Sequence, residues 1–266
     1  GGSGGSGATG GSGGSTPAAA VRRCCYGYLQ RQLPPGGCGR PLLIAGRATI
    51  SEVVRRDDWL PAGFDQAFGA ASQNEAAAER WTADALLEHA SVGSFARFVL
   101  DLLAVGAPLS LVRDAVQAMG DEIEHASACF AQASRFSGQT RGPGPLPIDG
   151  AFATTSLLDI ARRALVEGCI GETLAVLQAE QALARASDEP SRVALAKIIE
   201  DETRHACLAY RFIAWAAGDE DVRQALLADV QQVMGRDATS AEHVDNLHRV
   251  VEPCLVAALR APLAAA

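Results

Sequence analysis

The sequence predicts an all-α protein: a bundle of four long helices, two extra C-terminal helices and a small irregular N-terminal segment. Apolar residues recur with helical spacing through most of residues 75–266, which we expect to form one helical domain. Aromatic residues make up only 5% of the chain and alanine is abundant, which favours close-packed helices over a sheet. The third observation is a repeated pattern, Asp-Glu-x-x-His, at 121–125 and 201–205, because Glu and His three residues apart are typical of helices that line a bundle core.

Residues 1–16 are rich in glycine and serine and form a disordered linker that cannot build a core. Two origins stay open for it: an engineered scar, or the tether that follows the acylated cysteine of a secreted bacterial lipoprotein. The chain does not begin with Met, so any leader has already been removed. An exported or lipoprotein-tethered bacterial protein is favoured over a cytoplasmic one, and the compartment stays open.

Residues 17–74 form a second segment, which is basic in its first part. Its first part contains a single acidic residue, Glu52, but many arginines. The arginines are Arg22, Arg23, Arg31, Arg40, Arg47, Arg55 and Arg56. The stretch 41–50 has the pattern of a short hairpin. We interpret the segment as a positive flap docked on the acidic helical domain, and a lid or partner surface is the alternative. Four apolar side chains should anchor it: Trp59, Leu60, Phe64 and Phe68.

The first pair of helices is predicted over about 75–104 and 108–136, with a short turn at 106–108 between them. The stretch 141–147 alternates glycine and proline and cannot be helical, so we expect a long connection after the second helix.

The second pair is predicted over 156–187 and 188–218. Ser156 and Asp159 resemble a capping box at the start of the third helix. Asp188 can cap the fourth helix, with Pro190 in its first turn. Two shorter helices follow: 219–234 and 241–260. The order of short turn, long crossover and short turn is a known bundle connectivity.

Composition excludes several classes of protein. The net charge of −8 argues against a nucleic-acid partner. The chain contains no run of 18 apolar residues, so no transmembrane span is predicted.

Four of the seven cysteines are predicted to be small buried side chains within helices: Cys129, Cys169, Cys207 and Cys254. The other three cluster near the N-terminus, where Cys38 could bond Cys24 or Cys25 in an exported protein. The absence of a CxxC pair argues against a zinc knuckle.

The motifs predict a dinuclear metal site, because each predicted bundle helix carries an acid on its apolar face. A charge on such a face is costly unless it has a partner, and two cations between the helices would supply one. The predicted ligands are Glu88, Glu122, His125, Glu172, Glu202 and His205. Half-exposed surface charges are the alternative interpretation.

Register supports this set, because residues equidistant from the turn of an antiparallel hairpin lie at one level. Glu88 and Glu122 bracket residue 105, and Glu172 and Glu202 bracket residue 187, both near predicted turns. Glu167 fits less well, so we take it as a reserve ligand or a supporting acid.

Three further polar residues accompany the ligands. Asp121 and Asp201 each precede a ligand Glu, and we predict that they accept hydrogen bonds from ligand imidazoles, on their own helix or across the bundle. Solvated acids are the alternative. His89 is adjacent to Glu88 and points about 100° away from it, so we expect a supporting or surface role.

The order Glu, Glu-x-x-His, Glu, Glu-x-x-His over residues 80–218 is similar to the ligand order of the ferritin-like di-iron superfamily. The phrases at 88–98 and 167–175 resemble an uncharacterised ferritin-like family common in myxobacteria, whose members often carry secretion leaders. The spacing of Glu167 and Glu172 is similar to that of tRNA-modifying ferritin-like hydroxylases, although the acidic chain argues against tRNA. The resemblance implies a ferritin-like fold with two iron ions, or Mn/Fe, and names no substrate.

Three functions follow as hypotheses. The first is an oxidase or oxygenase that activates dioxygen and attacks an unknown small-molecule or peptide substrate. The second is a ferroxidase or iron-handling protein with no organic substrate, and the third is a non-catalytic bundle that metal stabilises. The N-terminal appendage and the extra helices would interfere with assembly into a storage cage. No dinucleotide, haem or flavin motif is visible, so electrons would come from a partner or the substrate.

Overall fold

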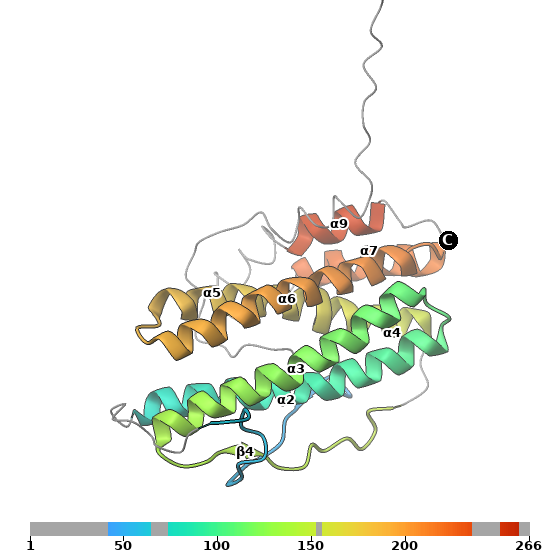
Figure 1. Ribbon diagram of the computed structural model, residues 1–266. Coiled ribbons are helices and arrows are strands. Elements are labelled where there is room, and N and C mark those ends of the chain that lie inside the picture. Colours follow the sequence, from blue (N-terminus) through green and yellow to red (C-terminus); the bar gives the residue numbers. More distant parts are fainter. Residues whose placement is uncertain (1–41, 65–73, 153–155, 236–250, 261–266) are drawn as a thin grey trace, which may run out of the picture.

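The computed structural model of the chain describes residues 42–64, 74–152, 156–235 and 251–260, and it is mostly helical over these residues, as predicted (Figure 1). The helical elements are α2 (Glu75–Ala104), α3 (Leu109–Ser137), α4 (Leu157–Arg163), the π-helix η1 (Ala164–Glu172), α5 (Thr173–Arg185), α6 (Glu189–Ala216), α7 (Glu220–Gly235) and α9 (Glu252–Arg260). Two small antiparallel sheets pair β1 (Leu42–Ile44) with β2 (Arg47–Thr49), and β3 (Val53–Val54) with β4 (Gly142–Pro143). Within the described ranges, none of the helices combines the length and apolar character that a membrane span needs.

The helix boundaries agree with the predicted ones to within two residues for α2, α3, α6 and α7. Side-chain caps explain two of the helix starts. Ser156 and Asp159 form a reciprocal capping box ahead of α4, and the Asp188 carboxylate accepts a hydrogen bond from the Ser191 amide at the start of α6. The predicted helix 156–187 is wrong in one respect, because a π-helical segment interrupts it between α4 and α5.

Several predictions lie outside the described residues. These are the linker 1–16, the first part of the basic segment, Phe68, the N-terminal cysteines Cys24, Cys25 and Cys38, and the start of the last helix before residue 251. Cys129, Cys169 and Cys254 are buried, as predicted, whereas Cys207 is only half-buried.

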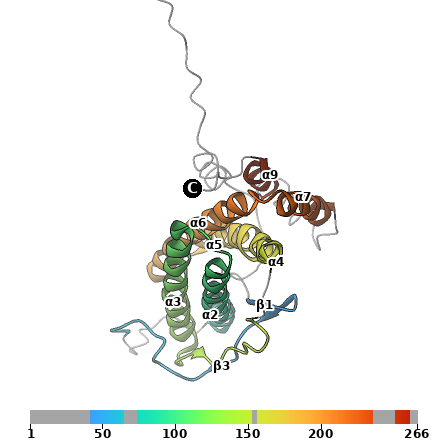
Figure 2. The same ribbon diagram turned by 90° about the vertical axis from the view of Figure 1, so that its right-hand side faces the viewer.

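The long helices pack as two pairs. α2 lies along α3, while η1 and α5 lie along α6, and contacts between α3 and α6 join the pairs. Figure 2 shows α7 and α9 on the outer side of α6 and the strands on the outer side of α2. The short hairpin expected within 41–50 is present as β1 and β2.

Two hydrophobic clusters fill the interior. One contains Phe95 and Phe212 and extends to α7 and α9, and the other contains Trp81 and Phe130. Along each long helix, the buried acids and imidazoles lie between these clusters. The core is thus split at one level by a polar layer, which needs its own explanation.

Residues 42–64 dock on the helices, as predicted for the basic segment, but charge attraction does not account for the contact. Leu42 is fully buried, Arg97 of α2 donates a hydrogen bond to the Leu43 carbonyl at 2.7 Å, and Trp59 packs against the second hydrophobic cluster. Arg56 pairs with Asp58 of its own segment. Among the described residues, no ion pair joins 42–64 to the helices, so strand pairing and apolar contacts hold the segment.

Candidate metal centre

The structure brings all six predicted ligands together in the interior, each at most 2% exposed. α2, α3, η1 and α6 supply them: Glu88, Glu122, His125, Glu172, Glu202 and His205. Their ligand atoms form two groups, and within each group all atoms lie within 4.8 Å of one another. The groups are Glu88, Glu122, His125 and Glu202, and Glu122, Glu172, Glu202 and His205. Glu122 and Glu202 belong to both groups, so the two groups share two carboxylates.

Both imidazoles turn the same nitrogen toward the carboxylates. Nδ1 of His125 lies 3.7 Å from Glu122 and 3.6 Å from Glu202. Nδ1 of His205 lies 3.0 Å from Glu122 and 3.3 Å from Glu202. Two imidazole nitrogens therefore point into one carboxylate cluster from α3 and α6.

The other imidazole nitrogen meets an aspartate from the opposite motif. Nε2 of His125 is 2.9 Å from Asp201, and Nε2 of His205 is 3.2 Å from Asp121. Of the two arrangements that the sequence allowed, the structure has the one between different helices, α3 and α6. With a proton on Nε2 donated to the aspartate, each Nδ1 lone pair is aimed inward.

The donor atoms lack the hydrogen bonds that burial normally requires. Within the described residues, the carboxylate oxygens of Glu88, Glu122 and Glu202 and both inward Nδ1 atoms are buried without a hydrogen bond of normal geometry. Each such group costs on the order of 1–3 kcal/mol or more if nothing compensates it. Carboxylate and imidazole donors that converge in a dry interior fit a first-row transition-metal ion, so the residues present can hold a metal.

The electrostatics without metal show what a cation would replace. Burial raises the pKa of Glu88 well above its usual value, and repulsion from Glu122 and Glu202 adds to this rise. Burial also opposes ionisation of Glu202, but contacts with His125 and His205 outweigh it and hold the pKa well below normal. Burial alone would lower the pKa of both imidazoles, yet the hydrogen bonds to their aspartates and the negative charge of the facing carboxylates raise it. Protons thus occupy the cluster, and cations would displace them.

The aspartates are held by basic residues that sequence reasoning missed. Arg204 contacts Asp121 at 2.9 Å and Asp201 at 2.7 Å, and Lys197 contacts Asp201 at 2.7 Å. Arg204 lies inside the second Asp-Glu-x-x-His motif, three residues after Asp201, so its spacing carried a usable signal.

Glu167 is placed apart from the ligand atoms. It accepts hydrogen bonds from Arg97 at 2.6 Å and from Ser94 at 2.8 Å, and all three residues are buried. Glu167 and Glu172 both lie in the π-helix and are both buried. Residues five apart diverge by about 140° in an α-helix and by less in the wider turns of a π-helix, where hydrogen bonds run from i to i+5. Glu172 therefore reaches the cluster while Glu167 meets Arg97.

His89 lies outside the cluster and contacts the N-terminal segment instead. Its ring nitrogen is 3.0 Å from the Ser51 hydroxyl, and its ring meets Trp59 edge to face at 4.9 Å. Burial, together with the nearby Arg56, lowers the pKa of His89 to about 4. His89 therefore contacts the N-terminal segment and none of the six ligand residues.

No protein-family model, no curated protein and no solved structure matches this chain.

Proposed function

We propose that this chain is a ferritin-like four-helix protein that holds two metal ions and acts as a dinuclear non-haem oxidase or oxygenase. The observation that carries the proposal is the pair of donor groups that share two carboxylates. One ion would be held by Glu88, Glu122, His125 and Glu202, and the other by Glu122, Glu172, Glu202 and His205. A mixed carboxylate and imidazole donor set suits iron, or manganese with iron, and such ions when bound supply dioxygen reduction.

The protein's own residues would orient and tune the site. Asp201 and Asp121 hold the proton of each ligand imidazole on Nε2, which keeps Nδ1 available. Burial alone would raise the pKa of Asp121 and Asp201, but the hydrogen bonds from His205 and His125 lower it, and contacts with Arg204 and Lys197 add to this. Glu88 would surrender its proton when a cation enters, because the raised pKa comes from burial and from neighbouring anions that the cation would neutralise.

The surroundings favour a stand-alone enzyme over a subunit of a storage cage. The strands and residues 42–64 cover one side of the helices, and α7 and α9 cover another, so these faces are not free for assembly (Figure 2). The apolar clusters on either side of the polar layer would keep water from a reactive centre.

Oxygen uptake tests the proposal. Protein loaded anaerobically with Fe(II) should consume dioxygen, and a Glu122→Ala variant should lose this uptake while Glu124→Ala, an exposed change on the same helix, keeps it. Sustained turnover with a reductant and a candidate substrate supports an oxygenase. A single uptake burst set by the iron added supports a ferroxidase instead. If iron-loaded protein takes up no oxygen, the metal has only a stabilising role.

A further inference from the structure

One part of the α2–α3 pair exposes large apolar side chains. Leu100 and Leu103, near the end of α2, are 54% and 60% exposed. Leu109, Val116 and Ile123 follow one another at intervals of seven residues on α3, and all three are exposed. Seven residues are nearly two full turns, so these three side chains form one stripe along the helix. The five residues together are called the α2–α3 face below, and exposed apolar surface of this kind marks interaction sites.

The chain covers the same side of α3 further along the helix. Ser134 lies 18 residues after Val116, which is five full turns, so both residues point to one side. Ser134 is fully buried, and its hydroxyl accepts a hydrogen bond from the Arg141 amide at 2.9 Å. Ala131, on the same side, is also buried. The fold therefore covers this side of α3 near its end and leaves it open between residues 109 and 123.

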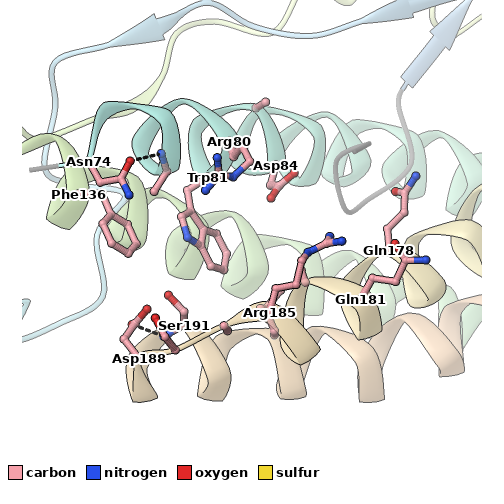
Figure 3. Close-up of a pocket in the computed structure, with 16 residues that line it drawn as sticks. Asn74, Arg80, Trp81, Asp84, Phe136, Gln178, Gln181, Arg185, Asp188 and Ser191 are labelled. Atoms are coloured by element: carbon pink, nitrogen blue, oxygen red, sulfur yellow. Dashed lines mark hydrogen bonds between the residues drawn. The ribbon is translucent and has the colours of Figure 1, made fainter. Parts of the chain in front are cut away.

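The largest cleft near these helices is separate from the α2–α3 face. It has a volume of about 690 Å³ and lies between α2 and α5, where Trp81 and Arg185 reach into it (Figure 3). Two arginines and two aspartates line it, so its charge favours neither an anion nor a cation. None of the residues of the α2–α3 face lines this cleft, and the exposed stripe needs a partner of its own.

The charges beside the stripe favour a second copy of the chain as that partner. Arg113 and Glu124 are exposed on α3, and neither forms an ion pair with a residue that the structure describes. Asp114 and Asp121 of the same helix are already paired with arginines of α6. The face thus offers a cation near one end and an anion near the other, with no excess of either sign. A partner that matches it carries the same charges in the reverse order, which a two-fold axis supplies.

The spacing of these two residues places the axis. Residues 113 and 124 are equidistant from the level between residues 118 and 119, so an axis there brings each Arg113 beside Glu124 of the other copy. The two α3 helices then run antiparallel. At the same register, Val116 of one copy lies level with residue 121 of the other, between Gly120 and Ile123 of the stripe.

Gly120 fits a close approach of two helices at this level. Glycine is disfavoured inside a helix because it has the most backbone freedom to lose. A Cβ atom placed on Gly120 would meet no atom within 4 Å, so packing inside the chain gives no reason for a glycine there. Beside the axis, the missing side chain lets the backbones of two α3 helices come close together.

We propose that the α2–α3 face joins two copies of this chain in a two-fold dimer whose α3 helices cross antiparallel near Gly120. The apolar side chains of the two faces bury one another, and two pairs of Arg113 with Glu124 fix the register. The strands, α7 and α9 lie on other sides of the bundle, so the dimer leaves them uncovered (Figure 2). The contact uses no residue of the candidate metal centre and does not depend on metal.

Sedimentation equilibrium of the full chain over a range of concentrations, in the presence of chelator, tests the dimer. The chain should form a species of twice its own mass that dissociates on dilution. V116E and G120L should each raise the dissociation constant at least tenfold, because they add a charge or bulk at the contact. V193E makes the same change at an exposed valine of α6 outside the face and should leave the constant unchanged. Circular dichroism checks that each variant folds. A monomer at every concentration, or a dimer that V116E leaves intact, overturns the proposal.

Charge reversal tests the register. R113E should weaken the dimer at least tenfold, because it sets a like charge against the Glu124 carboxylate of the other copy at both ends of the contact. The double variant R113E/E124R restores opposite charges and should bring the dissociation constant back to within a few-fold of that of the unmodified chain. A double variant that dimerises no better than R113E overturns the antiparallel register.

Discussion

Replacing Glu122 with alanine should remove most of the stability that the protein gains from bound metal. Glu122 is fully buried and belongs to both donor groups, so its loss weakens the binding of both ions together. We expect a large loss of stability in the metal-loaded protein and little change in the metal-free protein.

The magnitudes follow from linkage and burial. A ligand at 100 to 1,000 times its dissociation constant stabilises a fold by about 2.7 to 4.1 kcal/mol, and most of this should disappear in the loaded Glu122→Ala protein. In the metal-free protein, the lost side-chain CH₂ costs about 0.8 kcal/mol. Burial and repulsion from Glu202 both oppose the ionisation of Glu122, so removing this carboxylate offsets that cost. The loss of its contacts with His125 and His205 destabilises the protein instead. We therefore expect a metal-free change within about 1 kcal/mol of zero.

Urea unfolding followed by circular dichroism, with chelator and with excess Fe(II) under anaerobic conditions, measures both quantities. Glu124→Ala is the matched control, because it makes the same change two residues further along α3 at an exposed position. It should shift both curves equally and slightly. If Glu122→Ala destabilised the chelated and the loaded protein by the same amount, the cluster would be a structural polar layer and the metal reasoning would be refuted.

Three further predictions concern the surroundings of the site. Asp201→Asn should reduce metal affinity about 10- to 100-fold by loosening His125, measured by competition with a chromogenic chelator, and an unchanged affinity contradicts the assigned role. Arg97→Gln should destabilise the metal-free protein by about 3–5 kcal/mol, measured by urea unfolding, because it leaves the buried Glu167 carboxylate without its partner. The double variant with Arg97→Gln and Glu167→Gln should lose less stability. A double variant that loses more stability than Arg97→Gln would refute this prediction. Deleting residues 17–74 should leave a folded protein that binds two metals yet exposes apolar surface and changes its oxygen reactivity. Dye binding and oxygen-consumption rates equal to those of the full chain would reduce that segment to a tether.

The helices and the ligand set were predictable because their signals are local. Periodic apolar residues mark α2, α3 and α6, and a carboxylate cap at Asp188 marks a helix start without reference to the rest of the fold. The six ligand residues share this advantage, since each stands out as a charged side chain on an apolar face. Their meeting in space then follows from hairpin register.

The parts that sequence reasoning missed depend on contacts between distant segments. The π-helix η1 has no local signature, and the apolar run around Glu167 and Glu172 reads equally well as an α-helix. Arg97 selects Glu167 as its partner 70 residues away, a pairing that only the packing of α2 against η1 creates. The pairing of β3 with β4 and the cleft between α2 and α5 arise in the same way. The prediction of Glu172 rather than Glu167 as a ligand came from hairpin register, which did not take the wider turns of the π-helix into account.

The most direct test of the central claim is the number of metal ions that each chain holds. Protein loaded anaerobically with Fe(II), freed of excess metal and measured by elemental analysis against protein concentration, should contain two irons per chain. The count should fall well below two in Glu122→Ala and stay at two in Glu124→Ala. A count that settles at zero or one iron per chain in the unmodified protein contradicts the dinuclear site.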